Sequence, residues 1–487
     1  MKLQQTQRIK TLKEKMLAQP RYASIEQAMI ITKTYKENED KPVILKRALS
    51  LYNALTQLEI GIEPEEMIVG NRTKGVRYGV VFPEAGSSWI EEEIETLPTR
   101  PQDRFLVRPE DIQTFREVIY PYWKGKCMED VVKQRYGDEI KAIAEVVKIN
   151  QKDHAQGHIC PDVNKWLRLG PKGIMEEAQQ YLKTCNDEAK DFYEAIQIVM
   201  SGVCTFMMRY HDLLLEESKK EEHAEWKDNM IEVARICKSL SERPAQTFHE
   251  ALQAVWFLFT VLHMESNASS FSPGRLDEIL IPYYEKDVKK GILDEQKALE
   301  MIECLWLKFN QIVYLRNKNS AKYFAGFPIG FNIAIGGMDA HGNDYSNTLS
   351  HLFLTAQEHL GLPQPNLSVR LHEGTSNELL KEAVRVVAKG SGMPQFFNDK
   401  AVISSIQELG IEEKDARDYA IVGCVELTTQ GNNLGWSDSA MFNLNKALEV
   451  ALTGGICLLT GEKIAPDYGN LETYETFEEL EAAFKKQ

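Results

Sequence analysis

The alternation of hydrophobic and polar positions changes its rhythm near residue 325. Apolar residues recur at helical spacing through residues 1–60 and again through most of 109–315, most regularly at 187–217 and 249–266. The segment 249–266 is apolar on almost every side, which predicts a buried helix. After residue 325, short apolar runs bounded by glycine or proline alternate with helical patterns, which predicts an α/β core whose strand ends carry function.

The pattern assigns bounds to these elements. Residues 83–108 carry several prolines and are expected to be irregular. The expected strands are 67–70, 331–335, 367–371, 394–397 and 419–422, and the later helices are 346–360, 377–389 and 438–452. A last helical pattern at 477–486 has no stop signal after it, from which we expect the chain to be incomplete.

Composition narrows the class of protein. The chain has 487 residues, 43% of them apolar and 26% charged, typical of a large soluble globular protein. A net charge of −15 argues against binding to nucleic acid or to an anionic membrane surface. The eight cysteines form no CxxC pair, and the N-terminus lacks a signal-peptide core, so we expect a cytoplasmic protein without a disulfide scaffold or zinc ribbon.

The run IVGCVE at 421–426 holds the most informative pair of residues. An apolar strand ends at Gly423, and Cys424 and Glu426 follow. In an extended loop residues i and i+2 point the same way, so a thiol and a carboxylate would face one small space. A thiol can transfer a hydrogen atom and a carboxyl can move a proton, so the pair suits radical elimination chemistry.

Two other roles for Cys424 stay open. A single cysteine after an apolar strand is most often a small buried hydrophobe. A nucleophilic cysteine would need a histidine base, and the nearest histidine in sequence is His372, with none after Cys424. A neighbouring carboxylate raises the pKa of a thiol, so Glu426 favours a neutral S–H group over a thiolate.

Further polar clusters supply candidate site residues. His158 and Asp162 lie in GHICPD at 157–162, and Ser269 and Ser270 follow the buried helix. His158 is alternatively a structural histidine, and the serines belong to what is alternatively a simple turn. Asp438 is either a helix N-cap or a second carboxylate near Cys424. Arg275 and Asp277 read as structural partners.

Several stretches together resemble one family. They are KRAL at 46–49, EMIVG at 66–70, ESN at 265–267, PGRLD at 273–277, PQPNLSVR at 363–370, GCVE at 423–426 and WSD at 436–438. Along its whole length the chain resembles the glycyl radical enzymes of the pyruvate formate-lyase-like superfamily. The resemblance implies a helix-rich α/β barrel of two five-stranded halves, with one domain spanning 1–487: a helical region to about 325 and a strand and helix region from 326.

The resemblance also implies a chemistry. Cys424 would become a thiyl radical, and a separate radical-AdoMet activating enzyme would create the radical on a glycine, with no cofactor bound directly. The Cys-x-Glu loop is similar to the eliminating branch, whereas pyruvate formate-lyase has two adjacent cysteines. Glu426 would then be the base. A small substrate would contact His158, Asp438, Ser270, Ser269, Asp162 and Gly330, and the full-length protein would be a homodimer.

The chain departs from the glycerol dehydratase pattern at two pocket positions and in the absence of one motif. Ser269 stands in place of a histidine and Gly330 in place of a tyrosine, which enlarges the pocket and disfavours glycerol. No Arg-Val-x-Gly-Tyr-like run occurs within 1–487, so the glycine radical domain is expected to be absent from this chain. Two alternatives to an eliminating enzyme remain: a C–C-cleaving relative, of the decarboxylase or formate acetyltransferase type, and a truncated, catalytically silent chain.

Overall fold

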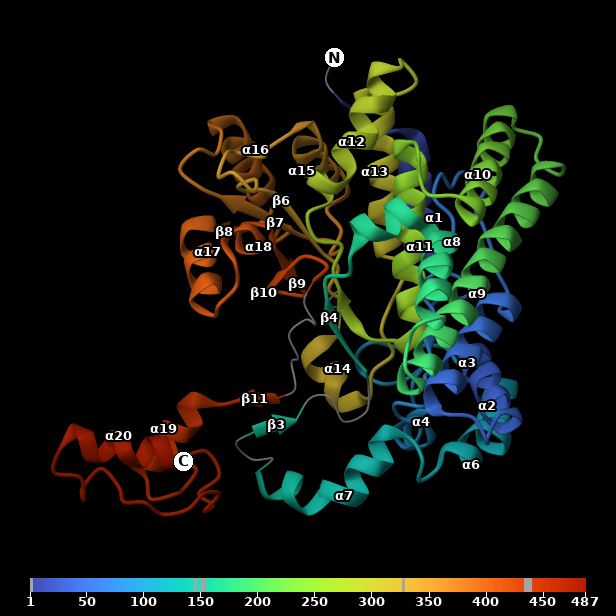
Figure 1. The fold of residues 1–487 in the computed structure, drawn as a ribbon. Helices are drawn as coiled ribbons and strands as arrows, with labels where there is room; N and C mark the ends of the chain where they lie inside the picture. Colours follow the sequence, from blue (N-terminus) through green and yellow to red (C-terminus); the bar gives the residue numbers. More distant parts are fainter. Residues whose placement is uncertain (1–2, 144–146, 150–154, 326–328, 433–439) are drawn as a thin grey trace.

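The computed structural model describes residues 3–143, 147–149, 155–325, 329–432 and 440–487. Long helices stack against one another on one side, and a small parallel sheet with its own helices lies on the other (Figure 1). The segment that carries α19 and α20 lies apart from both, near β3. Within the described residues, no helix combines the length and apolar character that crossing a membrane requires.

The helices follow most of the expected bounds, and the three helices predicted in the first 60 residues are confirmed. The first group is α1 (Gln7–Ala18), α2 (Glu26–Glu37), α3 (Val43–Gln57), α4 (Ser88–Glu93), α5 (Pro109–Thr114), the π-helix η1 (Phe115–Ile119), α6 (Tyr120–Trp123), α7 (Met128–Ile143), α8 (Val163–Leu182), α9 (Asp187–Ser218), α10 (Ala224–Glu242) and α11 (Phe248–Ser266). The second group is α12 (Leu276–Lys289), α13 (Glu295–Phe309), α14 (Lys318–Phe324), α15 (Thr348–Leu360), α16 (Asn377–Val387), α17 (Asp399–Glu408), α18 (Glu413–Arg417), α19 (Leu444–Leu452) and α20 (Phe477–Lys486).

The strands form small sheets. They are β1 (Ala23–Ser24), β2 (Gly79–Val80), β3 (Val147–Ile149), β4 (Gln156–Ile159), β5 (Ser269–Phe271), β6 (Asn332–Gly336), β7 (Asn366–Leu371), β8 (Gln395–Asn398), β9 (Tyr419–Val422), β10 (Glu426–Thr429) and β11 (Ala440–Phe442). β6, β7 and β8 form a parallel sheet, β4 pairs with β5 in parallel, and β9 and β10 form an antiparallel hairpin. The two five-stranded halves implied by the resemblance therefore stay a prediction.

Helix α11 is the centre of the main hydrophobic core, as its all-round apolar pattern predicted. Thr247 caps its start by accepting from the backbone N–H of Glu250. The Trp256 ring packs 5.8 Å from that of Phe309, which lies 4.7 Å from the ring of Phe331, measured between centroids. Phe331 immediately precedes β6, so this core fixes where the parallel sheet begins.

Two expected elements are wrong in type or start. Residues 67–70 are buried but form no strand, because the side chain of Gln253 pairs with the backbone of Val69, accepting from its N–H and donating to its C=O. A helix from 438 is also wrong. β11 occupies 440–442, and α19 begins at Leu444 with Asn443 as its N-cap.

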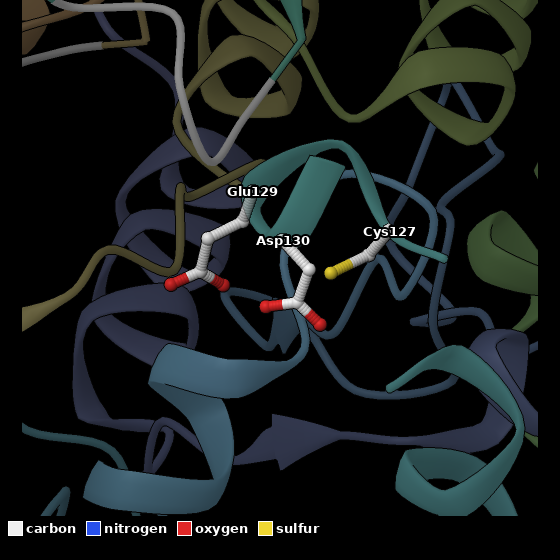
Figure 2. A group of neighbouring side chains, drawn as sticks. All are labelled: Cys127, Glu129 and Asp130. Carbon is white, nitrogen blue, oxygen red and sulfur yellow. The ribbon is translucent and has the colours of Figure 1, made fainter. Parts of the chain in front are cut away.

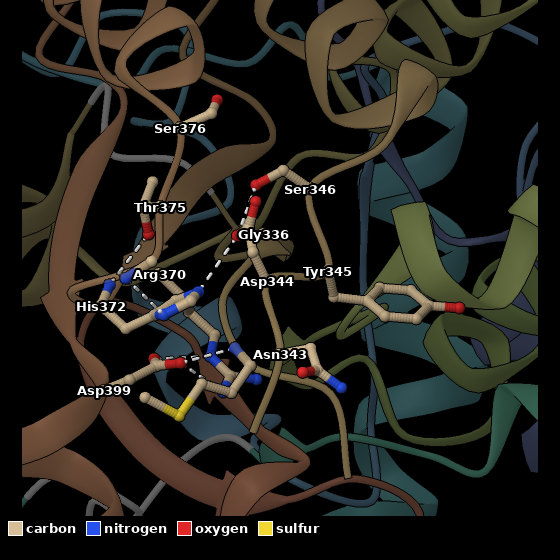
Figure 3. A network of polar contacts seen from close by, with 12 residues as sticks. Gly336, Asn343, Asp344, Tyr345, Ser346, Arg370, His372, Thr375, Ser376 and Asp399 are labelled. Carbon is tan, nitrogen blue, oxygen red and sulfur yellow. Dashed lines mark hydrogen bonds and ion pairs between the residues drawn. The ribbon is translucent and has the colours of Figure 1, made fainter. Parts of the chain in front are cut away.

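Arg370 and Asp399 form a fully buried ion pair (Figure 3), and Arg370 also joins the sheet to the hairpin. Arg370 of β7 contacts both carboxylate oxygens of Asp399 at 3.0 Å and donates to the carbonyl oxygen of Tyr419. The Tyr419 hydroxyl in turn donates to Asp399 at 2.8 Å. β9 also packs beside β6 through Tyr419, Ile421 and Ala334, so the hairpin has a rigid base.

We expect Asp399→Ala to destabilise the protein by about 3–5 kcal/mol, because it leaves the guanidinium of Arg370 buried without its counter-charge. Denaturant unfolding measures this. The matched control is Lys400→Ala, which breaks the exposed pair between Lys400 and Glu373 and should leave the unfolding midpoint almost unchanged. Equal midpoints for the two variants would contradict the importance given to the buried pair.

Candidate active site

Cys424 lies at the tip of the β9–β10 hairpin. β9 is completely buried, whereas Cys424 is exposed. Val422 and Glu426 are partners in the register, so residues 423–425 form a three-residue turn. The expected extended loop is therefore wrong, although the Glu426 carboxylate does reach the backbone of Cys424. Gly423 makes the turn possible: its φ is +58°, and a Cβ there would lie 2.9 Å from Ser270 Oγ.

Glu426 folds back over the turn. Its Oε2 accepts from the backbone N–H groups of Cys424 and Val425, both at 3.0 Å, and its Oε1 lies 3.5 Å from His158 Nε2. Burial by itself raises the pKa of Glu426, but the hydrogen bonds from His158 and from the backbone lower it below its ordinary value. The carboxylate is therefore ionised at neutral pH, in the form that can accept a proton.

His158 and Ser270 reach the hairpin from the neighbouring strands β4 and β5. Both have positive φ values, +48° and +64°, which are strained for residues with a side chain. The two strands approach so closely that a Cβ at Gly157 would lie 1.8 Å from the carbonyl oxygen of Ser269. This close approach brings His158 Nε2 to 3.5 Å from Glu426 Oε1. The two residues are far apart in sequence.

Ser270 lies between two glycines. Its hydroxyl is 2.6 Å from where a Cβ at Gly330 would be and 2.9 Å from where a Cβ at Gly423 would be. Gly330 also has a φ of +92°. Ser269, the preceding residue, is half-buried and pairs with Gln156. Ser270 is thus next to the turn that carries Cys424, and Gly330 is next to Ser270; their contact with a substrate stays a prediction.

Of the two remaining candidate carboxylates, only Asp162 lies within the described residues. Asp162 is the N-cap of α8: its Oδ1 accepts from the backbone N–H of Lys165 at 2.8 Å. Its backbone also lies against Gly431, just after β10. This capping contact gives Asp162 a structural role. Asp438 lies outside the described residues, so its expected place in the site stays a prediction.

Three polar residues at the base of the turn were not predicted. Ser272, Asn332 and Asn366 are buried, and all three make hydrogen bonds with the backbone of Gly423. The sequence does contain a signal for two of them: Asn332 and Asn366 are polar residues at the starts of apolar strands. Buried amides in such positions need partners, but the sequence does not say which.

A second group of potential ligands lies at the start of α7 (Figure 2). A sulfur and carboxylate oxygens of Cys127, Glu129 and Asp130 lie within 4.8 Å of one another. Both oxygens of Asp130 are already engaged, by the hydroxyl of Ser88 and the backbone N–H of Gly125, each at 2.7 Å. Burial raises the pKa of the Cys127 thiol, which keeps it protonated. These hydrogen bonds give the group a structural role at the start of α7.

The fold and the site together define a helix-rich α/β protein with an exposed cysteine at the tip of a hairpin, whose backbone N–H donates to an ionised carboxylate. The family model described as pyruvate formate lyase-like matches residues 3–487, and the chain belongs to this family. Membership was expected from the sequence motifs and is confirmed.

Named relatives and solved structures agree with this placement. The chain is 32% identical to (2S)-3-sulfopropanediol dehydratase of Klebsiella oxytoca, over 99% of this chain and 60% of the relative. It is 30% identical to trans-4-hydroxy-L-proline dehydratase of Clostridioides difficile, over 99% and 62%. The glycerol-bound B12-independent glycerol dehydratase from Clostridium butyricum superposes with a TM-score of 0.95 at 34% identity, over 100% of this chain and 62% of that one. The chain thus spans about 60% of the length of the relatives it matches.

Proposed function

We propose that this chain carries the thiyl site of a glycyl radical dehydratase or lyase that eliminates a leaving group from a small hydroxylated substrate. One observation carries the proposal. An ionised carboxylate, Glu426, bonds to the backbone N–H of the exposed Cys424 and lies beside His158. The names of the relatives, which include dehydratases, support an eliminating reaction over C–C cleavage.

The reaction follows from these groups. The Cys424 thiyl takes a hydrogen atom from the carbon that bears the substrate hydroxyl, giving an S–H bond and a carbon radical. Glu426 accepts the hydroxyl proton, and the resulting ketyl radical expels the neighbouring group with its bonding electron pair. The carbonyl-bearing radical then takes the hydrogen atom back from Cys424, which regenerates the thiyl. His158 holds Glu426 in place, and we propose that it also binds a substrate hydroxyl.

We place the source of the radical outside residues 1–487. A glycine in a separate segment or chain, oxidised by a radical-AdoMet activating enzyme, would generate the thiyl. The remaining partners are a small substrate and, for the complete protein, a second copy of the chain. Asp438 is proposed to hold a further substrate hydroxyl.

The substrate is proposed to be bulkier than glycerol. Gly330 brings no side chain toward Ser270, and Ser269 offers a small hydroxyl where an imidazole would fill more space. Relatives acting on a sulfonated diol and on a hydroxyproline, as their names state, are compatible with such a pocket.

The test is product analysis of the anaerobically activated complete enzyme with diols, amino alcohols, hydroxyprolines and sulfonates. We expect a carbonyl product together with the released water, amine or sulfite. Release of formate or carbon dioxide would show the C–C-cleaving alternative instead. Absence of both a glycyl radical signal and turnover would favour the silent chain. As a control, residues 1–487 alone should give no glycyl radical signal.

A further inference from the structure

The backbone of the Cys424 turn is held by side chains that come from the parallel sheet. The carbonyl oxygen of Gly423 accepts two hydrogen bonds, from Asn332 Nδ2 at 3.0 Å and from Asn366 Nδ2 at 2.9 Å. The backbone N–H of Gly423 donates to Ser272 Oγ at 3.1 Å. Both polar groups of this glycine are therefore bound by side chains on other strands or loops.

The two asparagines are placed for this contact by the register of the sheet. Asn332 of β6 and Asn366 of β7 are direct partners in the parallel pairing, so their side chains stand next to each other on one face. Both are buried, Asn332 completely. Ser368 donates to Asn332 Oδ1 at 2.9 Å, which fixes the direction of that amide and aims its N–H group at Gly423.

The side chain of Asn366 is only partly satisfied by hydrogen bonds among the described residues. Among the described residues, its buried Oδ1 has no hydrogen-bond partner. An unpaired buried acceptor is destabilising, and an apolar residue of similar size would avoid the penalty. An amide at this position is thus explained by what its Nδ2 does, and its Nδ2 donates to Gly423.

The carbonyl that the asparagines bind belongs to the same peptide group as the backbone N–H of Cys424. That N–H donates to Glu426 Oε2 at 3.0 Å. One planar peptide therefore connects the two amides to the carboxylate, and donors at its carbonyl end strengthen donation from its N–H end. The orientation of this peptide determines both where the Cys424 side chain begins and how Glu426 is held.

We propose that Asn332 and Asn366 are positioning residues, which fix the Gly423–Cys424 peptide and so keep the thiol and the Glu426 carboxylate in one geometry. The proposal rests on the function proposed above for Cys424. Without the two bonds, a three-residue turn that contains a glycine would sample several conformations, and the backbone of Cys424 would leave its place beside Glu426 for part of the time.

The test uses the chain itself and does not depend on turnover. In the double variant Asn332→Leu and Asn366→Leu, hydrogen exchange of a peptide spanning 423–426 should be at least about tenfold faster, equivalent to about 1.4 kcal/mol. The matched control is Asn229→Leu, which also removes an amide-to-carbonyl bond, from α10 to Glu66, and should leave exchange of this peptide within about twofold of the parent. Exchange within twofold of the parent in a double variant that melts normally would overturn the proposal.

A milder variant covers the case in which the double variant does not fold. Ser368→Ala removes only the bond that orients Asn332, so it should speed exchange of the same peptide by a smaller factor, about threefold; no change would overturn the proposal. In the activated complete enzyme, the double variant should lower kcat while KM stays within about twofold. A raised KM with unchanged kcat would instead assign the amides to substrate binding. Retained turnover in a Cys424→Ser enzyme would refute the thiyl role yet leave the exchange result standing.

Discussion

Replacing Cys424 by serine should abolish turnover of the activated complete enzyme while the glycyl radical persists. Serine has nearly the same shape, so the hairpin turn and its contacts with Glu426 should remain. Its O–H bond is much stronger than the S–H bond of cysteine, however, and a radical cannot readily be formed there and returned. Electron paramagnetic resonance would measure the glycyl radical, and product formation would measure turnover.

The matched control for this variant is Cys185→Ser. Cys185 is a half-buried cysteine just after α8, in a different part of the molecule from the hairpin. We expect the control to keep parental turnover and the parental radical signal. Product formation by the Cys424→Ser enzyme would refute the assignment of Cys424 as the thiyl residue.

Glutamine in place of Glu426 should stop elimination but not the preceding hydrogen transfer. Its amide oxygen can still accept from the backbone of the turn, whereas it cannot take a proton from the substrate hydroxyl. General-base catalysis typically contributes about 10²–10⁴-fold, so kcat should fall by about that factor. In heavy water, the substrate recovered from this variant should still gain deuterium from the Cys424 thiol, which mass spectrometry detects.

The exposed Glu59, which pairs with Lys74 on the surface, provides the control Glu59→Gln. This variant should eliminate at the parental rate. Undiminished elimination by the Glu426→Gln enzyme would remove Glu426 as the base. Loss of deuterium incorporation as well would show that the carboxylate is needed earlier, for hydrogen transfer itself.

Local sequence patterns were enough for much of the fold. The helical spacing at 187–217 and the apolar run at 419–422 correspond to α9 and β9. The adjacency of Cys424 and Glu426 was also visible, since they are two residues apart. At residues 67–70, where the strand prediction is wrong, a distant side chain is responsible: Gln253 satisfies the backbone of Val69, so the apolar run there needs no neighbouring strand.

The rest of the site depends on pairing between remote strands. His158 meets Glu426 because β4 and β5 run side by side and a glycine lets them approach closely. Asn332 and Asn366 share one carbonyl because of the register of β6 and β7. Register and strand order are set by the packing of the whole core, around residues such as Phe331, and no short window of sequence contains them.

Strand β5 and the reactive hairpin are separate segments of the chain, which bears on how such proteins diversify. The groups proposed for bond breaking stand on one hairpin, whereas the residues proposed to contact the substrate, Ser269, Ser270 and Gly330, belong to other segments. Substitutions at Ser269, which is half-buried, need not disturb the hairpin. Under the proposed function, single mutations at these positions would change the substrate range while the reactive hairpin stays the same.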